Sequence, residues 1–189
     1  HVNYKNIQFD GNKIRIIDPE AKLDLGGIAK GYVADELTTL LEKEGVTSAV
    51  INLGGNISTI GGKPDGSPFI IGIEKPYTDR TEIIGTTTAD NQTVVTSGIY
   101  ERQFQKDGKI YHHVLSSKTG YPVETQLEAV SLVAKKGRSM DIDAMSTICL
   151  MKGVDGGKAF IKKQKGVEAV FSAQGKEVAK TKGMKFTAE

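Results

Sequence analysis

The sequence has a single cysteine among its 189 residues, so no disulfide can form within the chain. It contains no apolar run long enough to cross a membrane as a helix. Its formal net charge is only +2, and its lysines are scattered, without a basic run interleaved with aromatic residues. These features argue against a disulfide scaffold, a helical membrane span and nucleic acid as a partner.

Several well-known motifs of nucleotide and hydrolase chemistry are also missing. The glycine spacings of the dinucleotide fingerprint and of the phosphate loop do not occur, and there is no serine-hydrolase elbow. The composition is that of an ordinary globular protein, with 38% hydrophobic and 25% charged residues. The length is sufficient for one domain with a substantial core. Any functional site must therefore rest on other local patterns.

Strands outnumber helices in the expected order of elements, and most neighbouring strands are joined as hairpins. Helices are expected over 29–44, 139–151 and 155–163, the second capped by Ser139 or Asp141. The expected strands are 6–9, 13–17, 48–53, 57–60, 69–74, 82–88, 93–96, 102–104, 110–114, 129–134, 167–171 and 177–180. This order predicts an α+β fold, with helices packed on one face of an antiparallel sheet.

The stretch from Leu23 to Tyr32 combines an apolar, strand-like run with the start of an amphipathic helix. Gly26, Gly27 and Gly31 surround the junction, where the lack of a Cβ atom lets the backbone approach a ligand. The N–H groups and the positive dipole end of the helix favour a phosphate. The stretch is thus a candidate anion or nucleotide site, although a tight turn without a ligand fits the same spacing.

A second candidate site lies at the start of the helix expected over 139–151. Asp143 and Thr147 are four residues apart, so they share one helix face. A carboxylate and a hydroxyl on one face suit a hard cation such as Mg²⁺. An aspartate near a helix start is also favoured by the helix dipole alone, so capping is the alternative interpretation.

Two further runs hold residues capable of chemistry. His112 and His113 are neighbours on a strand, so one faces inward and the other outward, and an inward histidine suits a general base or a phosphate contact. A hydrogen-bonded, half-buried histidine is the alternative. The run Thr96–Arg102 combines hydroxyls, a glycine, an aromatic and an arginine, which suits a ring and a phosphate. Its alternative is a strand end with an exposed arginine, and Cys149 is interpreted as a core residue.

In this order, the patterns resemble the ApbE-type FAD:protein FMN transferases, formerly called thiamine-biosynthesis lipoproteins. The resemblance extends from about Val2 to the final hairpin. It is carried by the runs Asp24–Gly31 and Gly54–Asn56, by Thr96–Gly98 with Tyr100 and Arg102, by His113 with Thr119–Pro122, and by Asp143-Ala144 with Thr147.

The resemblance implies a T-fold-like α+β architecture and a metal-dependent reaction. FAD binds with Mg²⁺ or Mn²⁺, and FMN moves onto a threonine of a client flavoprotein with release of AMP. The implied metal ligands are the Asp143 carboxylate, the Thr147 side chain and the Ala29 carbonyl, and His113 is implied as a second catalytic residue. The resemblance also implies that His113 contacts the flavin or the phosphates. The other residues implied in these contacts are Gly26, Gly27, Lys30, Gly55, Asn56, Ser97, Gly98 and Tyr100.

The family also leaves the reaction open, since some members resemble FAD pyrophosphatases that release FMN and AMP. A flavin-binding module without catalysis is a third hypothesis. The chain departs from the family pattern at three places. Ile99 replaces an acidic residue, Ser116-Ser117 replaces aspartate-proline, and Lys118 stands where arginine is frequent.

Residues 1–189 are expected to form a single flavin-transferase-like domain that lacks the family's N-terminal portion. Apolar surface that this portion would cover is then exposed and favours self-association. By resemblance, the parent protein is expected at the outer face of the cytoplasmic membrane. It would touch the membrane only through a lipid anchor that is absent from this chain.

Overall fold

A computed structural model describes residues 1–79 and 81–189 and has the predicted α+β architecture. Its helices are a short 3₁₀ turn at Tyr4–Asn6, α1 at Ala29–Lys43 and α2 at Ser139–Ile161. The strands are β1 (Ile7–Asp10), β2 (Lys13–Ile16), β3 (Ala49–Asn52), β4 (Asn56–Ile60), β5 (Phe69–Glu74), β6 (Ile83–Ala89), β7 (Gln92–Gly98), β8 (Gln103–Lys106), β9 (Lys109–His112), β10 (Ala129–Lys135), β11 (Val167–Ala173), β12 (Lys176–Lys180) and β13 (Thr187–Ala188).

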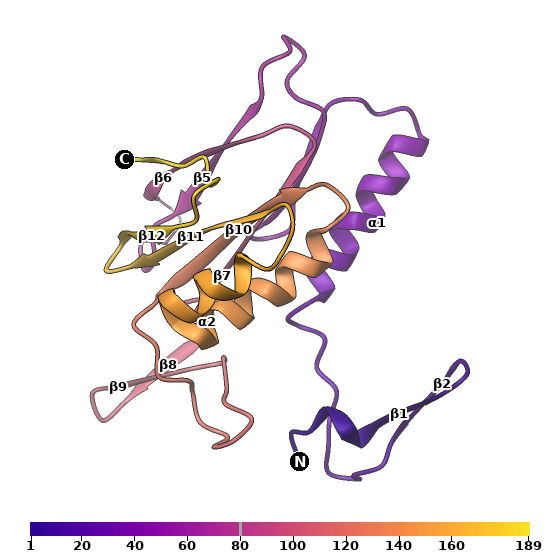
Figure 1. Ribbon diagram of the computed structural model, residues 1–189, viewed down its shortest axis with the longest axis vertical. Helices are drawn as coiled ribbons and strands as arrows, with labels where there is room; N and C mark the ends of the chain where they lie inside the picture. Colours follow the sequence, from indigo (N-terminus) through magenta and orange to yellow (C-terminus); the bar gives the residue numbers. More distant parts are fainter. Residues whose placement is uncertain (80) are drawn as a thin grey trace.

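A six-stranded antiparallel sheet, in the order β12-β11-β10-β7-β4-β3, forms the centre of the fold. Both helices pack on one of its faces, and Figure 1 shows α2 crossing in front of the sheet with α1 beside it. A smaller sheet, in the order β13-β6-β5, shares a second apolar cluster with the other face. The molecule therefore has three layers, and the predicted helices on one face are confirmed.

The alternation of side chains along the central strands explains these layers. On β10, Val130 and Leu132 belong to the core beneath α2, whereas Val133 belongs to the cluster beneath the small sheet. The same alternation on β7 turns Thr93 and Ser97 towards the helices, where both contact α2 residues. The helix-facing side of the sheet is thus apolar under most of α2 and polar near its first turns.

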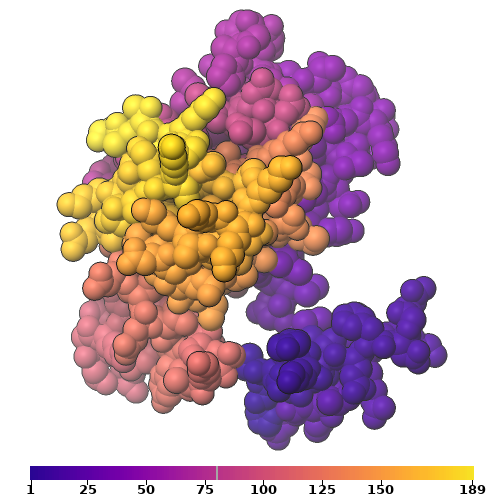
Figure 2. All heavy atoms as spheres, viewed as in Figure 1, coloured from indigo at the N-terminus to yellow at the C-terminus, as the bar shows by residue number. Residues whose placement is uncertain are grey.

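The β1–β2 hairpin stands apart from the layered body, as the indigo segment in Figures 1 and 2 shows. All four residues of β2 and three of the four of β1 are exposed, including Phe9 and Ile14. Exposed apolar side chains continue to Leu23 and Leu25, just before α1. The hairpin and the segment before α1 thus expose apolar surface, as expected from the sequence. Self-association through this surface stays a prediction.

Two details before and within α1 differ from the predictions. Residues 21–25 are irregular rather than strand-like, because they pair with no neighbouring strand. The apolar residues of α1 are also only partly covered, since Leu37 and Leu41 are half-buried. Tyr32 is 52% exposed, and Val33 and Leu40 are exposed as well. The helix instead buries Gly31, Ala34 and Thr38, because small residues let it lie close to α2 and β4.

The start of α2 also corrects a prediction. Neither Ser139 nor Asp141 caps the helix, since both lie inside it and Arg138 occupies the N-cap position without a side-chain capping bond. Gly153 has non-helical backbone angles, φ 67° and ψ −173°, and divides α2 near the expected break between two helices. Within the described residues, neither helix combines the length and apolar character needed to span a membrane.

Candidate functional site

Asp143 lies at the contact between the two helices. Its side chain is only 3% exposed, and its Oδ2 accepts a hydrogen bond of 2.9 Å from the Gly31 N–H. Gly31 is the third residue of α1, so this N–H has no partner within its own helix. The structure thus joins the glycine junction to Asp143 across 112 residues of sequence.

The hydroxyl groups predicted near Asp143 are also brought together. Ser97, near the end of β7, lies 2.6 Å from the Ser146 Oγ and 3.5 Å from the Thr147 Oγ1. Ser146 in turn donates to the Asp143 backbone carbonyl at 2.7 Å. The hydroxyls of Ser97, Ser146 and Thr147 therefore form one oxygen-rich cluster, on the helix that also carries Asp143.

The polarity beneath this cluster comes from a buried network. Asn56 is completely buried, and its Oδ1 accepts a 2.6 Å bond from the Ser139 hydroxyl, which also receives a bond from Thr93. The Asn56 Nδ2 has no hydrogen-bond partner among the described residues. The amide lies near the Asp143 carboxyl, whose pKa it lowers. The predicted contact of Asn56 with flavin stays a prediction.

The electrostatics of Asp143 reflect its burial. Burial raises the pKa of the carboxyl above its ordinary value, while the Gly31 N–H, the Lys30 ammonium and the Asn56 amide each lower it. The charge of Glu101 adds to the increase. A carboxylate in this position is stabilised by a nearby cation.

Lys30 extends from α1 to the second glycine turn. Its Nζ donates to the Gly54 carbonyl at 3.3 Å and lies 4.0 Å from the Glu101 Oε2. Gly55 and Tyr100 line an adjacent cleft of about 920 Å³, which runs between this turn and β5 and β6. The predicted flavin contacts Gly55 and Tyr100 therefore lie in one cavity, next to the turn that Lys30 contacts.

Gly98 and Tyr100 also belong together. The Tyr100 ring lies against the Gly98 backbone, so a Cβ atom at Gly98 would overlap the ring. The ring of Tyr77 also packs against Tyr100 in a tilted arrangement, with 5.7 Å between the two centroids. This glycine therefore serves the packing of an aromatic that lines the cleft.

The two histidines face opposite sides of β9 and its continuation, as predicted. His112 is buried and its Nε2 lies 3.2 Å from the Val123 carbonyl, whereas His113 is exposed. The His113 N–H and its ring Nδ1 both contact the Arg102 carbonyl, each at 3.2 Å. The structure thus does not bring His113 into hydrogen-bond contact with the oxygen cluster in the described part of the chain.

The remaining predicted residues lie at the start of α1. Gly26 and Gly27 are exposed in the turn before the helix, and the Gly26 N–H donates to Asp24 at 2.7 Å. Ala29 is the first helical residue, two positions before Gly31. Their predicted contacts to phosphate and metal stay predictions.

Residues that the sequence did not single out complete the cluster. Ser146 connects Ser97 to α2, and Asp35 accepts the Ser139 and Met140 N–H groups at 3.0 Å each. Asp35 follows Gly31 by four positions, so their shared helix face is the pattern in the sequence that could have identified Asp35.

Across residues 1–79 and 81–189, no group of three or more histidine, cysteine, aspartate or glutamate residues converges as a metal site. A metal here would depend on one carboxylate and on neutral oxygens.

The fold and the site together define an α+β protein whose candidate site combines a buried carboxylate, hydroxyl groups and a glycine junction. A family model described as the ApbE family matches residues 1–171, and the chain belongs to this family. It is 39% identical to the FAD:protein FMN transferase of Klebsiella pneumoniae (strain 342) over 160 residues, which are 85% of this chain and 48% of that protein. It is 34% identical over 179 residues to the one of Treponema pallidum (strain Nichols), covering 90% and 49% of the two chains.

Solved structures agree with this assignment. The ApbE protein of Thermotoga maritima matches with a TM-score of 0.77 and 29% identity, over 99% of this chain and 58% of that one. The apo form of the flavinyl transferase ApbE of Pseudomonas stutzeri matches with a TM-score of 0.73 and 30% identity, over 98% and 54%. The chain thus spans about half the length of the relatives it matches.

Proposed function

We propose that this chain forms the metal- and phosphate-binding part of an FAD:protein FMN transferase. The observation that carries the proposal is the buried Asp143 carboxylate, which accepts the Gly31 N–H. The same helix carries Thr147, whose hydroxyl lies 3.5 Å from that of Ser97. Membership of the ApbE family and the names of its relatives supply the reaction. The acceptor is proposed to be a threonine hydroxyl of a client protein.

The donor set fits a magnesium ion. Asp143 offers a carboxylate and Thr147 a hydroxyl, and Mg²⁺ prefers hard oxygen ligands of this kind. A cation would also stabilise a carboxylate whose pKa burial raises. Asp143, Thr147 and the Ala29 carbonyl would hold the ion, which supplies charge stabilisation to the pyrophosphate when bound.

The rest of the reaction is assigned to side chains around this cluster. The acceptor hydroxyl oxygen bonds to the phosphorus on the FMN side of FAD, and the bond from that phosphorus to the AMP oxygen breaks. His113 takes the proton of the hydroxyl as a general base. Lys30 balances phosphate charge, since its ammonium already reaches the Gly54 carbonyl from the start of α1. The flavin occupies the cleft lined by Gly55 and Tyr100.

Hydrolysis of FAD to FMN and AMP is the second candidate. It agrees with the exposure of His113, because an exposed base is accessible to water. The two reactions share every group proposed above except the acceptor. Release of FMN without a client therefore separates them.

The proposal is tested with the full-length protein, FAD, Mg²⁺ and a client that contains a threonine acceptor. We expect covalent labelling of the client, seen as flavin fluorescence in a denaturing gel, and loss of labelling on removal of Mg²⁺. Asp143→Ala should reduce labelling by at least about 100-fold, because it removes the charged metal ligand. Asp141→Ala is the matched control, since Asp141 lies on the same helix turn but faces solvent next to Arg138.

Three outcomes would contradict parts of this proposal. Labelling that survives Asp143→Ala unchanged would reject the metal assignment. FMN release without labelling of any client would favour the pyrophosphatase. Tight FAD binding with neither product would indicate a flavin-binding module without catalysis.

A further inference from the structure

The two helices cap each other at their N-terminal ends. The N-cap residues of α1 and α2, Ile28 and Arg138, make no side-chain capping bond. The first-turn N–H groups instead bond to carboxylates of the opposite helix. Gly31 of α1 donates to Asp143, and Ser139 and Met140 of α2 donate to the two oxygens of Asp35. Each contact is a charge-assisted hydrogen bond of 2.9 or 3.0 Å.

The spacing of these contacts fixes the alignment of the helices. Gly31 and Asp35 are one turn apart on α1, and Ser139 and Asp143 are one turn apart on α2. Between them the two backbones touch, since a Cβ atom at Gly31 would lie 2.5 Å from the Met140 Cα and from the Ser139 carbonyl oxygen. A slide or rotation of α2 along α1 would therefore break one capping pair or produce a clash.

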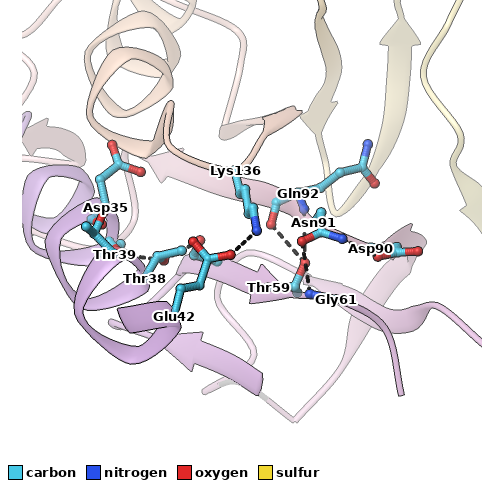
Figure 3. A network of polar contacts seen from close by, with 12 residues as sticks. Asp35, Thr38, Thr39, Glu42, Thr59, Gly61, Asp90, Asn91, Gln92 and Lys136 are labelled. Carbon is cyan, nitrogen blue, oxygen red and sulfur yellow. Dashed lines mark hydrogen bonds and ion pairs between the residues drawn. The ribbon is translucent and has the colours of Figure 1, made fainter. Parts of the chain in front are cut away.

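Asp35 is suited to this role by its surroundings. Figure 3 shows its carboxylate directed away from α1, apart from the Glu42–Lys136 ion pair further along the same helix. Both Asp35 oxygens are used by backbone N–H groups, so the side chain is held in one orientation. The first turn of α2 is thus attached to α1 four residues before Asp143.

We propose that Asp35 is a positioning residue for the site. By holding the first turn of α2 against α1, it sets the rotation of α2 and so directs Asp143 towards Gly31 and Thr147 towards Ser97. Asp35 itself touches neither substrate nor metal. The consequence for catalysis rests on the proposed function, whereas the effect on Asp143 does not.

The first test is amide hydrogen exchange of the full-length protein, comparing wild type with Asp35→Asn. The N–H groups of Ser139 and Met140 should exchange faster by about 10- to 100-fold, since they lose bonds to a charged acceptor. The Gly31 N–H, which does not touch Asp35, should also exchange at least about 10-fold faster. Glu42→Gln is the matched control, because it removes a carboxylate of α1 whose partner is the half-exposed Lys136 ammonium rather than a backbone N–H of α2.

A purely local role gives a different result. Faster exchange at Ser139 and Met140 with unchanged exchange at Gly31 would overturn the proposal, since Asp35 would then be only a helix cap. Asp35→Glu, which keeps the carboxylate but displaces it by one methylene group, replaces Asp35→Asn if that variant does not fold. The same pattern of exchange is expected for it, with smaller changes.

The second test measures flavin transfer. Asp35→Asn should lower kcat by about 10- to 100-fold and raise the Mg²⁺ concentration for half-maximal rate, because its effect reaches the site through Asp143. Glu42→Gln should leave both unchanged, and equal kinetics in wild type and Asp35→Asn would overturn the proposal. A wild type without transfer activity, together with the expected exchange at Gly31, would reject the proposed function and still support the positioning of Asp143 by Asp35.

Discussion

The contact between α1 and α2 and the β8–β9 hairpin both contain predicted site residues, but the chain holds them very differently. At the helix contact, Asp143 and Asn56 are buried and bonded to other elements. On the hairpin, every residue of β8 is exposed, and His113 contacts only the neighbouring Arg102 carbonyl among its described hydrogen bonds. The hairpin is stabilised mainly within itself, by the stacked rings of Phe104 and Tyr111 at 5.1 Å.

This difference separates two parts of the proposed reaction. The groups proposed for metal and phosphate are positioned by the folded chain itself, so they are preorganised before any ligand binds. The proposed base lies on a segment whose orientation relative to the cluster is set by few contacts, so a client or the rest of the protein must complete its position. Mutations in the first region should therefore change stability and activity together, and those in the second should change activity alone.

The largest expected effect separates activity from stability. His113→Ala should lower flavin transfer by about 10²- to 10⁴-fold, the usual contribution of a general base. It should change the free energy of unfolding by less than about 0.5 kcal/mol, because the side chain is exposed. Transfer rates and urea unfolding of the full-length protein provide both measurements.

Lys106→Ala, at another exposed position of the hairpin, is the control and should leave both quantities unchanged. A loss of stability in His113→Ala would show that the hairpin is more firmly integrated than its contacts indicate. Unchanged transfer would remove His113 from the mechanism.

A smaller effect, on stability and activity together, is expected at the helix contact. Gly31→Ala places a methyl group 2.5 Å from the Met140 Cα, where only backbone movement can make room. It should reduce the free energy of unfolding by about 1–3 kcal/mol, as overpacking usually does, and should lower transfer as well. Urea unfolding measures the first effect and gel fluorescence the second.

Gly27→Ala is the matched control for stability, because a Cβ atom at Gly27 meets nothing within 4 Å. Its free energy of unfolding should change by less than about 0.5 kcal/mol. Equal losses in the two variants would contradict the close packing of α1 on α2.

The smallest effect concerns pH and the inward-facing histidine. Burial lowers the pKa of His112 below its ordinary value, opposed by its bond to the Val123 carbonyl and assisted by the charge of His113. The unfolded chain therefore binds this proton more readily, so the free energy of unfolding falls as the pH drops below about 6.5. His112→Gln should reduce this pH dependence in urea unfolding between about pH 5 and pH 8, whereas His113→Gln should retain it. An identical slope in wild type and His112→Gln would contradict the assignment.

The sequence predicted local structure well where the signal was local. Residues 29–44 were expected as a helix and Ala29–Lys43 form one, and the hairpins around Gly11 and Gly175 are present. The shared face of Asp143 and Thr147 also follows from helical spacing alone. Hairpin pairing and helix periodicity depend on residues close in sequence, which explains this agreement.

Predictions failed where the partner was distant in sequence. The first N–H groups of α2 donate to the side chain of Asp35, which lies 104 residues from Ser139 in the sequence. No local pattern therefore marks this contact. The buried face of α1 was also not predicted, because close packing on α2 and β4 selects the small residues Gly31 and Ala34 and leaves Tyr32 outside. Hydrophobic periodicity identifies a helix, but it does not say which face a neighbour will cover.

The bond between Gly31 and Asp143 joins residues 112 positions apart, and this distance has a consequence for biosynthesis. Contacts of large sequence separation are slow to form, because closing a long loop costs chain entropy before the contact offsets it. During synthesis, Gly31 leaves the ribosome long before Asp143, so its N–H cannot bond to Asp143 until then. The site can therefore close only when most of this chain has been made, so nascent chains that end before α2 should lack the proposed metal site.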